Sequence, residues 1–113
     1  MKKIFDINDY DDKCVMHCRT LDEAVEFTQY LDSIGKRWCN KDRYRPTNTM
    51  WERYRADTCY EFIGGTFCEL RYFERNGYQI LSFADFDFKD IYEIGENDNE
   101  SFNQFIGEFV QTT

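Results

Sequence analysis

The segment from Thr20 to Trp38 constrains the fold most, because its pattern predicts one amphipathic helix with a start and a stop signal. Thr20 can cap the first turn, and Glu23 stands three residues later, where a capping box places its acidic partner. Gly35 suits the left-handed position that follows a last helical turn. One face of this helix is apolar and must be buried; it carries Leu21, Ala24, Val25, Phe27, Leu31 and Ile34.

Short strand-like runs flank this helix. Before it, residues 13–18 predict a two-faced strand, with Val15 and His17 on one face and Cys14, Met16 and Cys18 on the other. After it, residues 37–40 are expected to return as a strand beside the first. The opening residues 1–13 are polar and predict a strand or an extended lead-in.

A long irregular segment over residues 41–57 separates the helix from a predicted hairpin. This segment holds the only proline, and a loop of this length in a compact domain is often functional. Within it, residues 50–55 could form one helical turn. The hairpin strands are residues 58–63 and 66–70, and Gly64-Gly65 between them is a two-residue turn signal.

The chain after the hairpin allows two interpretations at Asn76-Gly77, either another hairpin turn or the stop of a short helix over residues 71–75. The helix is favoured, because Asn or Gly after Glu-Arg suits a left-handed cap. Residues 78–83 then predict the last strand, with Ile80 and Leu81 on opposite faces. The C-terminal residues 99–111 predict a helix that docks on its own domain or on a partner, through Phe102, Phe105, Ile106, Phe109 and Val110.

These elements predict a single α+β domain over residues 1–113, with the acidic segment 85–113 as an appended element. The expected architecture is a small, mostly antiparallel sheet with the capped helix packed on one face and the C-terminal helix near it. Aromatic residues make up 19% of the chain, and such large side chains can fill a core in 113 residues. Five cysteines without an export signal or a long apolar run predict reduced thiols and a cytoplasmic protein.

Charge is segregated along the chain, whose formal net charge is −8. Residues 36–57 hold seven Lys and Arg against three acids, whereas residues 85–113 hold eight acids and one Lys. Such asymmetry bears on partners rather than on the fold. A strongly acidic chain makes direct binding to duplex DNA unfavourable, because that affinity depends on neutralising phosphates.

Five short motifs follow one another within residues 14–86. They are Ser33-Ile34-Gly35, Lys36-Arg37-Trp38-Cys39, Trp51 with Tyr54, Thr58-Cys59-Tyr60, and Asn76-Gly77-Tyr78-Gln79-Ile80. In this order and spacing they resemble a recurring group of small proteins encoded by phages and prophages of Gram-positive bacteria. The resemblance implies a phage context and a bacterial host cell, but no activity or catalytic residue set. The acidic segment after Phe86 lies outside the shared pattern.

The first candidate site is a segment in which arginines alternate with aromatic residues. Guanidinium groups bind phosphate in a bidentate manner, and aromatic faces stack on bases, so the segment would suit a nucleotide, RNA or another phosphate-bearing ligand. The structural alternative is that the aromatic rings anchor the core and the arginines pair with acids of the tail. The candidate residues are Arg43, Tyr44, Arg45, Trp51, Arg53, Tyr54 and Arg55.

The second candidate site is the acidic tail. Carboxylates spaced along a surface can imitate a nucleic-acid backbone and enter a basic groove on another protein. The alternative is a solvated acidic face that keeps the protein soluble. The candidate residues are Asp85, Asp87, Asp90, Glu93, Glu96, Asp98 and Glu100.

No metal, cofactor or catalytic residues are predicted. Cys14 and Cys18 would share a strand face while His17 points the other way, which spoils a common zinc site. Catalysis by a Cys–His pair would have to use this single histidine. Asp85, Asp87 and Asp90 could hold a divalent cation, but acids at this density are usually hydrated.

The leading functional hypothesis is therefore a non-enzymatic, phage-type accessory protein. It would bind and inhibit a host or defence protein that handles nucleic acid, such as a CRISPR-type or restriction nuclease, through its acidic surface. The alternative is a binding module for a nucleotide, RNA or other phosphate-bearing ligand that uses segment 43–55. The sequence leaves the oligomeric state open.

Overall fold

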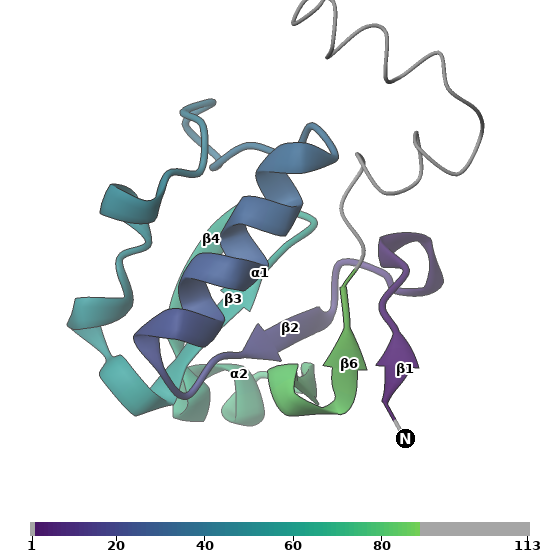
Figure 1. Ribbon diagram of the computed structural model, residues 1–113. Helices are drawn as coiled ribbons and strands as arrows, with labels where there is room; N and C mark the ends of the chain where they lie inside the picture. Colours follow the sequence, from purple (N-terminus) through teal and green to yellow (C-terminus); the bar gives the residue numbers. More distant parts are fainter. Residues whose placement is uncertain (1, 89–113) are drawn as a thin grey trace, which may run out of the picture.

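A computed structural model describes residues 2–88 of the chain (Figure 1). This part is a small compact α+β domain with two sheets, one of four strands and one of two. The strands are β1 (Lys3–Ile4), β2 (Cys14–His17), β3 (Thr58–Glu61), β4 (Thr66–Glu69), β5 (Gln79–Ser82) and β6 (Phe86–Asp87); the α-helices are α1 (Leu21–Ser33) and α2 (Leu70–Arg75). Short 3₁₀ turns cover Ile7–Asp9, Pro46–Asn48, Trp51–Arg53, Arg55–Asp57 and Phe83–Asp85.

The larger sheet has the strand order β4-β3-β2-β5, so the first strand after the N-terminal lead-in lies inside it. β2 pairs antiparallel with β3 and parallel with β5, and β3 pairs antiparallel with β4. Two of the three pairings are thus antiparallel, as predicted. The parallel pairing arises because α2 follows β4 and carries the chain across one face to the far edge.

The predicted helix start is confirmed. The Thr20 side-chain oxygen accepts from the Glu23 backbone N–H at 3.1 Å, and the Glu23 carboxylate accepts from the Arg19 N–H at 2.8 Å. The carboxylate thus bonds one residue earlier than a reciprocal capping box requires. The helix ends at Ser33, and Gly35 has a φ of +89°, the left-handed geometry expected after a last turn.

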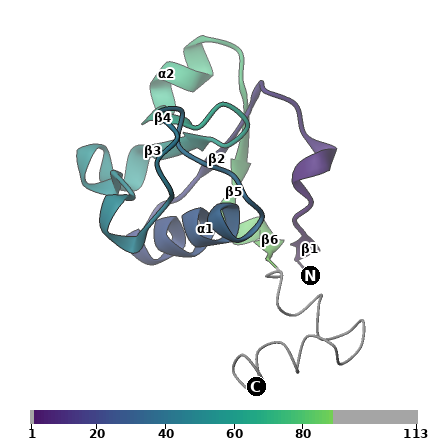
Figure 2. The same cartoon turned by 90° about the horizontal axis from the view of Figure 1, so that it is seen from above.

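The two helices lie on opposite faces of the larger sheet (Figure 2). Because both faces are covered, all four residues of β2 are buried, with the alternation that the sequence predicts. Val15 packs toward Phe73 of α2, while Met16 packs toward Phe27 of α1. Ile80 and Leu81 likewise belong to opposite faces. The α1 face holds the main core, which includes Phe5, Phe27, Leu31, Trp38, Tyr44, Tyr60, Phe62 and Phe86.

The prediction of a returning strand at residues 37–40 is wrong. This stretch turns instead, and β5 occupies the place beside β2. The backbone N–H of Cys39 donates to the carbonyl of Gly65 at 3.0 Å, so the stretch contacts the hairpin loop. Its hydrogen bonds are thus made to a loop rather than to a strand.

The β3–β4 hairpin is confirmed, but its loop is longer than the predicted two residues. Glu61 pairs with Thr66, which leaves residues 62–65 as a four-residue loop. The short helix after it is also confirmed as α2, with Asn76 as its C-cap and Gly77 at a φ of +79°. Thr58 to Glu69 therefore form a compact unit against which the long loop packs.

β5 is not the last strand, contrary to expectation. β6 follows it and pairs parallel with β1, which brings the two ends of the described chain together. The ring of Phe5 stacks on Tyr10 and makes an edge-to-face contact with Phe86 in this region. The predicted C-terminal helix lies outside the described residues, together with Asp90, Glu93, Glu96, Asp98 and Glu100. Within residues 2–88, each helix is too short or too polar to cross a bilayer.

Candidate functional site

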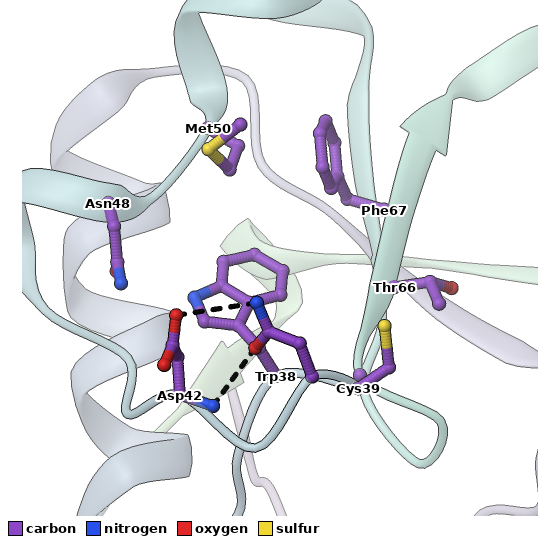
Figure 3. Close-up of a pocket in the computed structure, with 9 residues that line it drawn as sticks. Trp38, Cys39, Asp42, Asn48, Met50, Thr66 and Phe67 are labelled. Carbon is purple, nitrogen blue, oxygen red and sulfur yellow. Dashed lines mark hydrogen bonds between the residues drawn. The ribbon is translucent and has the colours of Figure 1, made fainter.

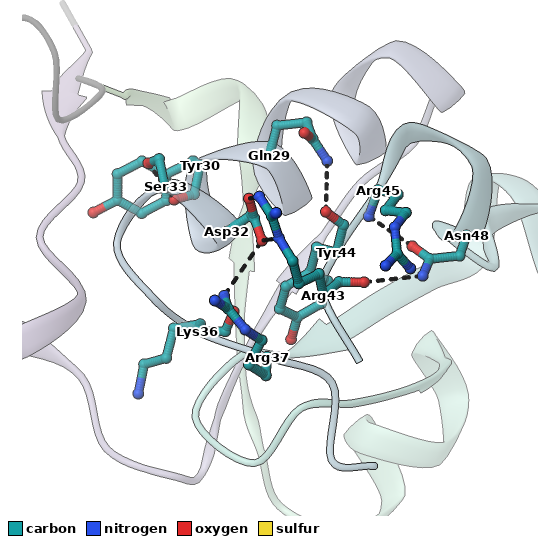
Figure 4. Close-up of polar contacts among 10 residues, drawn as sticks. All are labelled: Gln29, Tyr30, Asp32, Ser33, Lys36, Arg37, Arg43, Tyr44, Arg45 and Asn48. Atoms are coloured by element: carbon teal, nitrogen blue, oxygen red, sulfur yellow. Dashed lines mark hydrogen bonds and ion pairs between the residues drawn. The ribbon is translucent and has the colours of Figure 1, made fainter. Parts of the chain in front are cut away.

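The α1–β3 connection, residues 34–57, carries the basic and aromatic candidates, and one side of it is fastened to α1 (Figure 4). Arg43 binds Asp32 through two hydrogen bonds, from Nε to Oδ1 at 3.1 Å and from Nη2 to Oδ2 at 2.7 Å. Arg37 reaches the same carboxylate at 3.3 Å. The hydrogen bond from Arg43 lowers the pKa of Asp32 below its ordinary value. Asp32 therefore stays ionised and holds the connection against the helix.

Tyr44 is also a structural residue. Its side chain is buried, with the residue only 2% exposed, and its ring centroid lies 4.6 Å from that of Trp38. Burial raises the pKa of Tyr44 to about 12. Its carbonyl accepts from the Gln29 side chain at 3.1 Å. A buried ring offers no face to a base, so this residue leaves the set of stacking candidates.

Trp51 anchors the later part of the connection. Its indole N–H donates to the Cys18 carbonyl at 3.1 Å, next to the start of α1. Its backbone carbonyl accepts from the Thr58 hydroxyl at 3.3 Å. Two residues before Trp51, the Thr49 carbonyl accepts from the Tyr60 hydroxyl at 2.8 Å in a buried position. These bonds fix residues 49–51 against β3.

The backbone of the connection is strained at three positions. Lys41, Met50 and Arg55 are non-glycine residues with φ values of +78°, +63° and +50°. Such left-handed residues cost free energy and persist only where the surroundings enforce them. Met50, one of these left-handed residues, is also a large apolar side chain that is 37% exposed.

A pocket of about 350 Å³ opens between the connection and the β3–β4 hairpin (Figure 3). This volume lies within the range of small-molecule sites. Trp38, Met50 and Phe67 supply its apolar surface, and the ring centroids of Trp38 and Phe67 are 5.9 Å apart. Its polar surface comes from Cys39, Asn40, Asp42, Asn48 and Thr66.

Gly65 determines how closely the two walls of the pocket approach. A Cβ atom at this position would lie 2.6 Å from the Cys39 nitrogen and 2.7 Å from the Arg37 carbonyl oxygen, inside van der Waals contact. Its φ of +82° is likewise one that glycine favours. The second glycine of the predicted turn signal thus serves the pocket as well as the hairpin.

Most polar groups of the pocket are already hydrogen-bonded. The Asn40 side chain bonds to Asp42 at both ends, and the Asn48 side chain bonds to the backbone of Arg43 and Arg45. The indole nitrogen of Trp38, by contrast, has no acceptor among residues 2–88 and reaches the solvent of the pocket, because every fully buried side-chain nitrogen and oxygen of this part of the chain has a hydrogen-bond partner. The pocket therefore combines a mostly satisfied rim with an accessible donor on Trp38 and an accessible acceptor on Asp42.

Three of the predicted cations remain available in the segment that contributes Asn48 and Met50 to this pocket. Arg45, Arg53 and Arg55 are exposed, and none has a carboxylate partner within residues 2–88. The Arg45 N–H bonds to Asn48 of the pocket rim. Arg53 lies over the ring of Tyr54, which in turn lies 5.9 Å from Phe67. Along the chain, Arg45 precedes and Arg53 follows the pocket residues Asn48 and Met50.

The sequence prediction missed the pocket itself. Trp38 falls at the end of the predicted helix, Asp42 in a loop and Phe67 in a strand, so no local pattern joins them. Gly64-Gly65 was the only signal, since a second glycine in the turn allows the close approach of another segment. Which segment approaches Gly65 depends on contacts between distant residues, and sequence spacing does not encode those contacts.

The acidic candidates within the described part are Asp85 and Asp87. Both are exposed, and no Lys or Arg of residues 2–88 pairs with them. Asp87 lies in β6, opposite Ile4 of β1. The proposed pairing of tail acids with the arginines of the connection is not seen for these two residues.

The cysteines and the histidine are placed apart from the pocket, except for Cys39. Burial raises the pKa of the Cys18 thiol, and raises that of Cys59 to about 12, so neither is a thiolate near neutral pH. His17 is buried, and its Nε2 lies 2.6 Å from the Ala56 carbonyl. A carbonyl only accepts, so Nε2 carries the proton. No cluster of three or more His, Cys, Asp or Glu suited to a metal occurs in residues 2–88.

Comparisons with models of protein families, with curated protein sequences and with solved structures found no match to this chain.

Proposed function

We propose that this chain is a non-catalytic binding module for a phosphate-bearing ligand of the nucleotide or single-stranded RNA class. The observation that carries the proposal is the pocket of about 350 Å³ with an aromatic wall, together with exposed arginines in the adjoining segment that have no carboxylate partner in residues 2–88. An aromatic pocket accepts a planar ring, and guanidinium groups accept the attached phosphate. Segment 43–55 supplies Met50 to the pocket, and it also contains the arginines Arg45 and Arg53.

The arrangement divides the work between two kinds of residue. Trp38 and Phe67 contact the ring, whereas Arg45 and Arg53 lie outside the pocket and bind phosphate oxygens. Arg43 has a different role, because both of its hydrogen bonds go to Asp32. Tyr44 and Trp51 position the connection without touching the ligand, because one is buried and the other donates to Cys18.

A thermal-shift titration tests this function. The nucleoside monophosphates and a short single-stranded RNA should raise the melting temperature, since a ligand that binds only the folded state stabilises it. The variant R45A/R53A should lose most of this shift. The matched control R71A/R75A removes two exposed arginines from α2 and should keep it. If none of these ligands raises the melting temperature of the wild type, the proposal is wrong.

A second function is supported by a different observation, the exposure of Asp85 and Asp87 without cationic partners in residues 2–88. Here the chain is a phage-type accessory protein of the bacterial cytoplasm. It inhibits a host or defence protein that handles nucleic acid, by presenting carboxylates to a basic groove. Electrostatic steering of this kind weakens as salt concentration rises.

Charge reversal tests the inhibitory function. Replacing Asp85, Asp87, Asp90 and Glu93 by Lys should abolish co-purification of a partner from the bacterial host, while the circular dichroism spectrum stays unchanged. The control reverses four exposed acids elsewhere and therefore has the same net charge: Asp9, Asp12, Asp22 and Glu74. Equal loss of the partner in both variants would mean that total charge, rather than this surface, is recognised.

A further inference from the structure

The indole N–H of Trp38, which faces the pocket, constrains the chemistry of a ligand. The indole N–H of Trp38 has no acceptor within residues 2–88 and is open to the pocket, because no fully buried side-chain nitrogen of this part lacks a partner. A ligand that displaces water from this pocket must supply an acceptor to the indole N–H, because the donor would otherwise lose its hydrogen bond on binding. Trp51, by contrast, already donates its indole N–H to a carbonyl.

A strong acceptor lies on the same side of the pocket. Figure 3 shows the indole nitrogen of Trp38 on the side of the ring that faces Asp42 and Asn48. The amide of Asn48 is committed to the backbone at both ends. Within residues 2–88 the exposed carboxylate of Asp42 receives one side-chain hydrogen bond, from Asn40 to Oδ2 at 3.3 Å, so Oδ1 has no protein partner in this part of the chain. The pocket thus offers a donor and a negatively charged acceptor to one ligand edge.

From this complementarity we infer that the pocket binds a guanine base. The inference rests on the nucleotide-binding function proposed above and specifies the ligand. Guanine presents a carbonyl oxygen, O6, beside two N–H donors, N1–H and the N2 amino group, on one edge. The oxygen accepts from the indole of Trp38, and the two N–H groups donate to the carboxylate of Asp42. The flat ring then lies against Phe67 and Met50.

The other bases match this pair of groups less well. Adenine offers one donor and one acceptor on the corresponding edge, so it makes a single hydrogen bond to the carboxylate. Uracil has one N–H between two carbonyl oxygens, and one of those oxygens would face the negative charge of Asp42. Cytosine has a donor beside an unprotonated ring nitrogen. Hydrogen bonds to a charged group are the stronger ones, so the second bond to Asp42 distinguishes guanine.

The charge of Asp42 also fixes the orientation of the nucleotide. A phosphate inside the pocket would be repelled by the carboxylate, so the base enters and the phosphate stays at the rim. Lys41 is the residue directly between Asn40 and Asp42, and Arg45 bonds to the rim through its backbone. We therefore expect these two cations to bind an outward-pointing phosphate.

Calorimetric titration of the full chain with the four nucleoside monophosphates tests the inference. GMP should bind at least about tenfold more tightly than AMP, CMP or UMP. The variant D42N keeps the shape of the side chain but replaces the acceptor by a donor, so it should lose the preference for GMP. D12N, an exposed carboxylate with the same change of charge, should retain it. Equal binding of all four nucleotides would overturn the guanine inference and leave the proposed function intact.

The two tryptophans supply an internal control in nuclear magnetic resonance spectra. GMP should shift the indole N–H signal of Trp38, while that of Trp51 should stay in place because its hydrogen bond to Cys18 is already made. N-acetylarginine amide is the competing probe, since a guanidinium also suits a carboxylate beside aromatic rings. If this probe shifts Trp38 at lower concentration than any nucleotide, the pocket recognises a protein side chain and the guanine inference is overturned. If no nucleotide binds or shifts either signal, the proposed function fails as well.

Discussion

The two sides of the α1–β3 connection differ in how their polar groups are used. The side that faces α1 is saturated: Arg43 and Arg37 share the carboxylate of Asp32, and Gln29 binds the carbonyl of Tyr44. The side that faces the β3–β4 hairpin leaves the Trp38 donor and one oxygen of Asp42 without a partner in residues 2–88. One segment of chain is thus fastened on one side and open on the other.

This difference shows how an irregular segment can hold a binding site. A loop that was free on both sides would have to be ordered by its ligand, and that ordering would reduce the affinity. Here the bonds to α1 and β3 keep Met50 and Asp42 in place before any ligand arrives. The fastened side therefore preorganises the open one. Three changes should loosen the fastening to different degrees.

The largest effect is expected for G65A, which attacks the contact between the connection and the hairpin. The added Cβ would lie 2.6 Å from the Cys39 nitrogen at a φ of +82°, so backbone atoms must move. We expect a loss of about 3 kcal/mol in the free energy of unfolding, measured in urea. G35A is the control, because its φ of +89° is similar but no atom lies within 4 Å. Its loss should be about 1 kcal/mol, and equal losses in the two variants would refute the close-approach argument.

An intermediate effect is expected for Y60F, which removes the buried hydrogen bond to the Thr49 carbonyl. The carbonyl is left without its partner next to the strained residue Met50, so the free energy of unfolding should fall by about 1–2 kcal/mol. Y72F removes a hydroxyl from a residue that is 42% exposed and should have almost no effect. A Y60F protein as stable as Y72F would show that this bond does not hold the connection.

The smallest effect is expected for D32N, which loosens the α1 side. The hydrogen bond from Arg43 sets the pKa of Asp32 below its ordinary value of 3.8 in the folded state. The stabilisation by Asp32 is therefore complete above about pH 4 and is lost as the pH falls through the lowered pKa. At pH 7 the variant should melt about 2–4 °C below the wild type. This difference should shrink below pH 3.8; a difference that is constant from pH 7 to pH 3 would contradict the pairing.

The sequence predicted the elements whose formation depends on interactions between neighbouring residues. The cap at Thr20, the left-handed turn at Gly35 and the alternation along β2 each depend on residues no more than a few positions apart. The same reasoning found the β3–β4 hairpin and α2. It failed at residues 37–40, where a strand-like composition was overruled by a contact with Gly65, far along the chain.

The candidate site was predicted only in part. The pattern of segment 43–55 identified a region beside the pocket, but it grouped residues that the fold gives separate roles. Tyr44 became part of the core, Arg43 became a partner of Asp32, and Arg45 and Arg53 stayed exposed. Composition alone cannot separate these roles, because each type of side chain suits all of them.

The sequence by itself thus determined the class of fold, the capped helix, the hairpin and the segregation of charge. Period and capping are encoded by neighbouring residues, so no tertiary information is needed for them. The tertiary structure decided the parallel place of β5, the joining of Trp38, Asp42 and Phe67 in one pocket, and the choice of which arginines are paired. Those outcomes depend on contacts between distant segments, whose geometry is set only when the two faces of the sheet are covered.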